Sequence, residues 1–196
     1  MPGSILVVCT GNVCRSPIAE GFLRTLLEER LGDDAPLVAS AGTAGWEGAP
    51  ATPEAVAAAA ELGVDIAGHR ARALRAEHVL AADLVVTMTR EQRDEVAEEV
   101  PAARARVFTL KELVRSLEAE PIPPDVSERS PSALARLADE RRIRGLGRNP
   151  HDEDVVDPIG SPMETYRAVA WELQGWCRRL ADLMAPAPAR MEPGEG

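Results

Sequence analysis

A buried strand that runs directly into a cysteine-containing loop and then into a helix is the feature that most constrains this chain. The apolar run at residues 5–8 is typical of a central strand, and it ends at Cys9. Gly11 and Asn12 follow at the bend, where an asparagine tolerates left-handed backbone. The backbone N–H groups of such a loop can point inward and form an anion-binding nest. Pro17 stands at the expected first helical position, so the helix would aim its positive end at the loop.

Residues 9–15, here called the cysteine loop, carry the side chains of a phosphate site. Helix N-termini and nearby cations lower cysteine pKa values from about 8.5 to roughly 3.5–7.5, so we expect Cys9 to be a thiolate at neutral pH. The planar guanidinium of Arg15 can meet two phosphoryl oxygens at once. The Ser16 hydroxyl can donate to the sulfur and help it to depart in a second step. The alternative is a purely structural, buried cysteine, but the surrounding residues favour the phosphate site.

Strands and helices alternate along the rest of the chain. We expect strand, loop and helix at 4–31, then strands at 37–41, 84–88 and 106–109, and helices at 53–62, 75–82, 91–100, 111–117 and 161–184. This order predicts an α/β fold, a three-layer sandwich in which a four-stranded parallel sheet has helices on both faces. Ligands bind such sheets at the carboxyl ends of the strands, which is where Cys9 lies.

The chain is expected to form a single domain at residues 1–185, followed by a disordered tail at 186–196. Residues 119–153 interrupt the alternation and are treated as an insertion, with one polar helix at 131–144. The insertion could be a lid or a substrate-recognition arm, because it leads directly to Asp157. A solvated surface insertion is the favoured interpretation, since loops tolerate insertions at little cost in free energy.

The three cysteines are too few for the disulfide framework of a small secreted protein. Cys9 and Cys14 lie in one tight loop and could pair under oxidation, which would silence the nucleophile reversibly. The alternative is that Cys14 only packs beneath the loop. Cys177 is expected in the core, on a helix with an apolar stripe at helical spacing. That stripe consists of Tyr166, Val169, Leu173, Trp176 and Leu180.

Bulk properties exclude several classes of function. The formal charge of −10 and pI of about 4.9 argue against a nucleic-acid binder, whose surface is normally basic. We find no stretch long and apolar enough to cross a membrane and no signal-like N-terminus, so a cytoplasmic protein is expected. His69, His78 and His151 are isolated and show no metal-ligand spacing, so no metal and no cofactor are expected. The sequence leaves the oligomeric state open.

The segment Val8-Cys9-Thr10-Gly11-Asn12-Val13-Cys14-Arg15-Ser16-Pro17 resembles the loop V-C-x-G-N-x-C-R-S-P of the low-molecular-weight protein tyrosine phosphatases. Further similar segments follow in that family's order, and the resemblance covers most of residues 4–118 and 154–183. These segments are Ser40-Ala41-Gly42, Trp46, Thr52-Pro53, Gly68-His69-Arg70-Ala71-Arg72, Ala82-Asp83-Leu84-Val85-Val86 and Asp157-Pro158.

The resemblance implies a role for each matching position. Cys9 would be the nucleophile, Arg15 would bind the phosphoryl group, and Asp157, on a distant loop, would protonate the leaving group. Asn12, Ser16, Ser40 and His69 would brace the cysteine loop. The substrate would be lined by Thr10, Gly11, Asn12, Val13, Cys14 and Ser16, with Trp46 on one wall of the cleft.

The implied reaction is hydrolysis of a phosphorylated protein side chain in two steps. Cys9 attacks phosphorus while Asp157 protonates the departing atom, and water then hydrolyses the phosphocysteine with Asp157 as the base. Tyrosine phosphatases of this family commonly carry a bulky aliphatic residue after the nucleophile and aromatic residues after the Asp-Pro pair. Thr10 and Ile159-Gly160 stand there instead, which resembles the protein arginine phosphatase branch, although that branch has an aromatic residue where Ile159 lies.

Phosphoarginine is therefore the favoured substrate, and phosphotyrosine is the alternative. Arsenate reduction on the same scaffold is a weaker alternative, because it relies on further cysteines and Cys177 has no neighbouring partner. A non-catalytic phosphoprotein-binding module is weaker as well. Such a module would be expected to lack the nucleophile or the acid, and both Cys9 and Asp157 are present.

Overall fold

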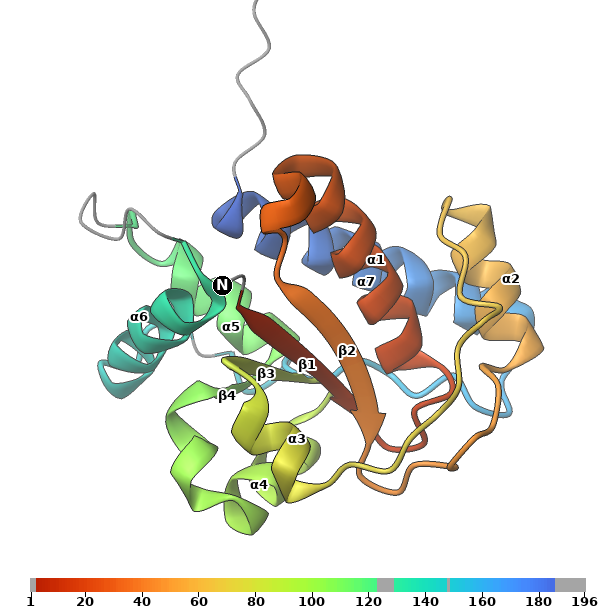
Figure 1. The fold of residues 1–196 in the computed structure, drawn as a ribbon, viewed down its shortest axis with the longest axis horizontal. Helices are drawn as coiled ribbons and strands as arrows, with labels where there is room; N and C mark the ends of the chain where they lie inside the picture. The colour runs from red at the N-terminus through yellow and green to blue at the C-terminus, as the bar shows by residue number, and fades with distance from the viewer. Residues whose placement is uncertain (1–2, 123–128, 148, 186–196) are drawn as a thin grey trace, which may run out of the picture.

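A parallel sheet forms the centre of the computed structural model, which describes residues 3–122, 129–147 and 149–185. Within these residues the strands are β1 (Ser4–Cys9), β2 (Leu37–Gly42), β3 (Leu84–Thr87) and β4 (Val107–Thr109). They are hydrogen-bonded in the order β2-β1-β3-β4, and every pair is parallel. The predicted four-stranded parallel sheet is confirmed (Figure 1).

Helices connect these strands and cover both faces of the sheet. They are α1 (Arg15–Leu31), α2 (Pro53–Glu61), α3 (Ala76–Ala81), α4 (Arg90–Glu99), α5 (Leu110–Glu118), α6 (Pro131–Ile143) and α7 (Met163–Met184), with 3-10 turns η1 (Gly32–Asp34) and η2 (Pro101–Arg106). Their bounds differ from the sequence-based ones by a residue or two, as is usual at helix ends. One expectation is wrong in detail. Pro17 is the third helical residue and not the first, a position where a missing N–H is equally harmless.

Alternation along β1 assigns its side chains to two separate layers. Ile5 and Val7 face the larger core, which α1, α2, α5 and α7 cover. Leu6 and Val8 face a smaller core beneath α3 and α4. Successive side chains of a strand point to opposite faces, so a strand buried on both faces reads as a continuous apolar run. The three-layer sandwich is therefore confirmed, with α1 and α7 side by side on one face (Figure 1).

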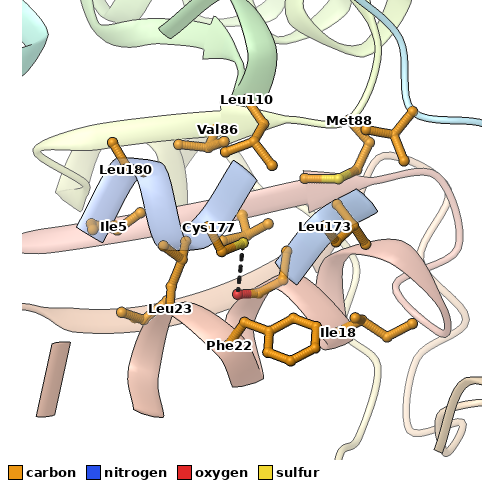
Figure 2. Close-up of a cluster of buried hydrophobic side chains, with 14 of the residues drawn as sticks. Ile5, Ile18, Phe22, Leu23, Val86, Met88, Leu110, Leu173, Cys177 and Leu180 are labelled. Carbon is orange, nitrogen blue, oxygen red and sulfur yellow. Dashed lines mark hydrogen bonds between the residues drawn. The ribbon is translucent and has the colours of Figure 1, made fainter. Parts of the chain in front are cut away.

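The long helix α7 closes the larger core. Figure 2 shows Leu173, Cys177 and Leu180 of α7 among side chains of α1 and of the sheet. Cys177 is fully buried, and its sulfur lies 3.8 Å from the carbonyl oxygen of Ala19, so its predicted core position is confirmed. Trp176 differs from the prediction, because it is only partly buried and the guanidinium of Arg179 lies 4.0 Å from its ring centroid.

The expected solvated insertion is wrong for α6. Leu134 and Ala138 are fully buried, and the side chain of Arg141 is only 2% exposed. Arg141 donates hydrogen bonds to the carbonyl oxygens of Ser116, Leu117 and Pro121 at 3.1, 2.7 and 2.8 Å. Arg141 is a buried arginine that caps the end of α5. In the sequence such an arginine looks the same as one exposed to solvent, which explains the error. The domain boundaries at 1–185 remain a prediction, and the expected tail at 186–196 lies outside the described residues.

The order of the strands locates the site. The chain leaves β1 toward β2 on one side and reaches β3 on the other, so the direction of winding reverses at the carboxyl end of β1. Such a reversal leaves a crevice where ligands of open α/β sheets bind. Cys9 is the last residue of β1. None of the helices in the described part of the chain combines the length and apolar character that a bilayer crossing requires.

Candidate active site

The carbonyl oxygens of residues 9–13 in the cysteine loop point outward, where each accepts a hydrogen bond. Backbone N–H groups serve four of these oxygens, and the Nε2 atom of His69 serves the fifth, that of Asn12, at 2.8 Å. The backbone pairs are Thr43 to Cys9 (3.0 Å), Ala44 to Thr10 (3.0 Å), Trp46 to Gly11 (3.2 Å) and Thr52 to Val13 (2.9 Å). With the carbonyl groups fixed outside, the peptide planes turn their N–H groups toward the centre of the loop.

Several hydrogen-bond donors without acceptors lie on the inside of the loop. Among the described residues, no protein acceptor takes the N–H groups of residues 10–14. Asn12 has a φ of +56°, the left-handed conformation that was predicted for the bend. Arg15 is only 4% exposed, and its Nε atom has no hydrogen-bond partner within the described residues. Buried donors without acceptors are costly unless a ligand supplies oxygen atoms. The loop is therefore built to hold an anion.

Cys9 lies in this ring with its sulfur 2.9 Å from the Ser16 hydroxyl oxygen. The side-chain amide of Asn12 donates to the same hydroxyl oxygen at 2.9 Å. Because that bond occupies an acceptor position of Ser16, the Ser16 hydrogen is free to point at the sulfur. The predicted contact between Ser16 and the nucleophile is thus present.

The bracing network extends behind the loop. The Asn12 amide also donates to Ser40 Oγ at 2.8 Å, and Ser40 in turn donates to Glu20 at 2.6 Å. The backbone N–H of Arg72 donates to Asn12 Oδ1 at 2.9 Å. The structure therefore brings together the predicted members Asn12, Ser16, Ser40 and His69. It adds Glu20 and Arg72, which only their three-dimensional placement reveals.

Asp157 reaches the loop from the far end of the chain. Its carboxylate accepts a hydrogen bond from Arg15 Nη2 at 2.5 Å, and Arg15 Nη1 donates to the Val155 carbonyl oxygen at 3.1 Å. Asp157 remains 43% exposed, whereas Arg15 is buried. The structure thus places the three predicted catalytic residues at one site, with the carboxylate at the mouth of the loop.

Thr10 has a partner that the sequence did not predict. The side-chain amide of Gln92 donates to the Thr10 hydroxyl oxygen at 3.0 Å. The oxygen of the same amide accepts from the N–H groups of Met88 and Thr89 at 3.1 Å each. The spacing from Thr89 to Gln92 is that of a capping box, so the cap was detectable in the sequence. The hydrogen bond from Gln92 to Thr10 was not detectable, because the two residues are 82 positions apart in the sequence.

Cys14 lies beneath the loop, with its sulfur 3.4 Å from the Thr52 hydroxyl oxygen. Burial raises the pKa of Cys14, an effect that hydrogen bonds from Thr52 and Tyr166 only partly offset. Both Cys9 and Cys14 are free thiols here, and the Cys9–Cys14 disulfide remains a prediction. Trp46 is 54% exposed, and a Cβ atom at Gly11 would lie 3.8 Å from its ring, so the indole flanks the loop as expected.

Comparison with known proteins agrees with this arrangement. Residues 4–131 match the family described as low molecular weight phosphotyrosine protein phosphatase. A protein-arginine-phosphatase of Geobacillus stearothermophilus is 33% identical over 93% of this chain and 96% of its own length. A probable low molecular weight protein-tyrosine-phosphatase, EpsP, of Ralstonia nicotianae is 38% identical over 74% of this chain and 98% of its own.

A solved structure shares the fold over almost the whole chain. It is described as the YwlE arginine phosphatase, a cysteine-to-serine mutant with a phosphorylated active site serine. Its TM-score is 0.70 at 30% identity, and the match covers 91% of this chain and 93% of that one. The chain therefore belongs to the low molecular weight phosphotyrosine protein phosphatase family and is a hydrolase, a protein phosphatase.

Proposed function

We propose that this protein hydrolyses phosphorylated side chains of proteins through a phosphocysteine intermediate on Cys9, with phosphoarginine as the preferred substrate. One observation carries the proposal more than any other. The sulfur of Cys9 lies beside the N–H groups of residues 10–14 and the buried Arg15 Nε, none of which has an acceptor among the described residues. A phosphoryl group would supply three oxygens to these donors directly in front of the sulfur.

In the first step the sulfur of Cys9 forms a bond to phosphorus while the bond from phosphorus to the side-chain atom breaks. Asp157, in its protonated form, gives its proton to that departing atom. In the second step the Asp157 carboxylate takes a proton from water, the water oxygen bonds to phosphorus, and Cys9 leaves as a thiolate that the Ser16 hydroxyl stabilises. A related phosphatase with a phosphorylated serine in the active site supports this assignment of the nucleophile.

The ion pair between Arg15 and Asp157 has a part in this cycle. Arg15 Nη2 binds the Asp157 carboxylate, although the phosphoryl oxygens would need the same donor. Binding of substrate would therefore release the carboxylate toward the leaving group. Since Asp157 is 43% exposed and Arg15 is buried, the carboxylate is the partner with room to move.

Preference for phosphoarginine is supported by the residues at the mouth of the loop. Thr10 is exposed, and Gln92 donates a hydrogen bond to its hydroxyl oxygen, so the residue that follows Cys9 presents a polar, positioned side chain. Ile159, which directly follows the Asp157-Pro158 pair and is 43% exposed, is aliphatic and not aromatic. Without a second aromatic wall, a phosphotyrosine ring would lose roughly 0.5–1.5 kcal/mol of stacking. The exposed Trp46 still offers one wall, which keeps phosphotyrosine as the alternative.

Two variants test the chemistry. The wild-type protein should hydrolyse p-nitrophenyl phosphate without added metal, and Cys9→Ser should abolish turnover. Asp157→Ala should lower kcat while the inhibition constant of inorganic phosphate changes little, because the loop donors remain. Full activity in Cys9→Ser would contradict the mechanism, and an unchanged kcat in Asp157→Ala would remove Asp157 from its role.

A side-by-side comparison tests the substrate class. Turnover of one peptide sequence carrying phosphoarginine should exceed turnover of the same sequence carrying phosphotyrosine. Thr10→Ile should shift the ratio of the two kcat/KM values toward phosphotyrosine, since it exchanges the polar group for an apolar contact. Equal or tyrosine-favoured rates in the wild type would contradict the arginine preference while leaving the phosphatase chemistry intact.

A further inference from the structure

The acid segment, residues 152–157, contains neither helix nor strand, yet basic side chains of α4 and α5 hold it residue by residue. Arg115 donates to the carbonyl oxygen of Asp152 at 2.6 Å and also pairs with its carboxylate. Arg93 contacts Glu153 at 3.4 Å. The backbone N–H of Arg90 donates to the Asp154 carboxylate at 2.8 Å. A segment without regular structure is thus fixed over three successive residues.

Lys111 is the centre of this arrangement. Its ammonium group is 2.8 Å from Asp152 Oδ1, 3.0 Å from the Asp154 carbonyl oxygen and 2.5 Å from Glu172 Oε1. The side chain is only 4% exposed. An ammonium group has three hydrogens to donate, and three oxygens surround this one. Burial would lower the pKa of Lys111, but the bonds to Asp152 and Glu172 outweigh burial and raise it, so the group remains charged.

The choice of lysine here is informative, because Lys111 is the only lysine in the sequence and the other strongly basic side chains are all arginine. A guanidinium presents a flat fork, whereas an ammonium is a compact charge whose donors can be directed to acceptors that converge on one point. Three oxygens from two different segments converge at this position. The geometry of the acceptors therefore accounts for the exception.

The contacts that fix the acid segment end at Val155, two residues before Asp157. The N–H of Val155 donates to the Met88 carbonyl oxygen at 2.8 Å, and its own carbonyl oxygen accepts from Arg15 at 3.1 Å. Beyond this point Val156 is 62% exposed and Asp157 43% exposed. The base of the segment is therefore fixed, whereas its tip, which bears the acid, is exposed and lies beside Arg15.

We propose that Lys111 is a positioning residue for proton transfer by Asp157, acting through Asp152 and the Asp154 carbonyl group. This inference rests on the proposed function. It differs from a purely structural role, in which Lys111 would serve only to tie α5 to α7 through Glu172. The two roles are separable, because within the described residues no hydrogen bond or ion pair joins Glu172 to the acid segment except through Lys111.

Leaving groups of different basicity provide the test. Aryl phosphates whose phenols span a wide pKa range report protonation of the departing oxygen, since a good leaving group needs no proton and a poor one does. With Lys111→Met, kcat/KM, which reports the step in which Cys9 displaces the leaving group, should fall tenfold or more for phenyl phosphate and less than about threefold for 2,4-dinitrophenyl phosphate. The rate of Cys9 alkylation and the inhibition constant of phosphate should stay at wild-type values, because the cysteine loop is untouched.

Three further variants make the result decisive. Asp157→Ala should show the steepest dependence of the rate on the pKa of the leaving phenol. Lys111→Arg keeps the charge, so its dependence should lie between those of Asp157→Ala and the wild type. Glu172→Gln should change thermal stability but keep the wild-type dependence, because Lys111 retains its bonds to the acid segment. If Lys111→Met does not fold, Lys111→Arg is measured in its place.

The outcomes separate the inference from the proposed function. If the rate of the Lys111 variant depends on the pKa of the leaving phenol as in the wild type, while the rate of Asp157→Ala depends on it steeply, the positioning role alone is overturned. If Glu172→Gln steepens this dependence as much as the Lys111 variant does, the positioning role is also overturned, since the effect would then come from the packing of α7. No turnover by the wild type, or a wild-type dependence in Asp157→Ala, would instead contradict the proposed function.

Discussion

Asn12 shows how much of this site depends on single side chains. Its amide group donates to both Ser16 and Ser40, its side-chain oxygen accepts from Arg72, and its carbonyl oxygen accepts from His69. These four bonds stabilise a left-handed residue that would otherwise be strained. The same bonds connect the nucleophile to two distant segments, so the shape of the loop depends on residues up to sixty positions away.

The three cysteines should differ in reactivity. Burial raises the pKa of Cys14 and that of Cys177, so both remain protonated thiols to a higher pH than an exposed cysteine. Cys9 faces the donors of the loop and should react first. At pH 6–7 iodoacetamide should modify one site, identified by peptide mass spectrometry as Cys9, and Cys9→Ser should remain unmodified over the same period. Modification of Cys14 ahead of Cys9 would contradict the electrostatic account of the loop.

Gly42 is required by the close approach of β2 to the cysteine loop. A Cβ atom there would lie 2.3 Å from the Thr10 carbonyl oxygen and 2.9 Å from the Asn12 nitrogen. Both are backbone atoms, so Gly42→Ala must displace the loop. We expect kcat/KM for p-nitrophenyl phosphate to fall tenfold or more, because a shift of about 1 Å in positioned groups can cost 10²-fold. Gly175→Ala, where nothing lies within 4 Å of the added atom, is the control. Equal activity of the two variants would contradict the requirement.

At this scale the sequence revealed the loop and, through the family resemblance, its supports Ser40 and His69, but not the other supporting residues. Cys9, Asn12, Arg15 and Ser16 lie within one short segment, so their spacing could be interpreted directly. Glu20, Arg72 and Gln92 reach the loop only after the chain folds, and in the sequence they resemble any other surface polar residue. Asp157 could be assigned only through the family resemblance, because nothing in its local sequence indicates that it lies near Arg15.

Among the elements, α7 offers a test of local propensity. Gly175 lies inside this 22-residue helix and is exposed, and an added Cβ atom would meet nothing within 4 Å. Replacing a glycine by alanine in a helix interior gains roughly 0.5–1 kcal/mol, since the unfolded chain loses conformational freedom. Gly175→Ala should therefore raise the urea midpoint without a change in the slope of the transition. A lower midpoint would mean that α7 needs the glycine for a contact that the described residues do not show.

Periodicity predicted the existence and type of the elements because most of them have an apolar face or a polar cap. Helix α4 begins with the capping box of Thr89 and Gln92, and α2 begins with Thr52 and Pro53. Helix α6 was underestimated, since small alanines and one arginine make up much of its buried side. Alanine is a weak signal of burial, and an arginine whose Nη1 and Nη2 atoms bond carbonyl oxygens cannot be distinguished in sequence from a solvated one.

For the molecule as a whole, the larger core determines the overall stability. Helix α1, which begins with Arg15, packs along α7 in this core. Leu173 is fully buried in this core, in the same cluster as Ile18 and Phe22 (Figure 2). Removing its side chain leaves a cavity that the rigid sheet cannot fill.

Leu173→Ala should therefore cost about 2–5 kcal/mol of the free energy of unfolding. In a chain of this size that corresponds to a decrease in Tm of roughly 4–20 °C, measurable by calorimetry. Trp171→Ala, on the exposed side of the same helix where the indole is 72% exposed, should stay within about 0.5 kcal/mol. Because the cavity lies behind α1 and not in the cysteine loop, kcat at temperatures well below the new Tm should stay close to the wild-type value. A large loss of kcat without a loss of stability would show that the core tunes the site directly, and would contradict the separation of the two.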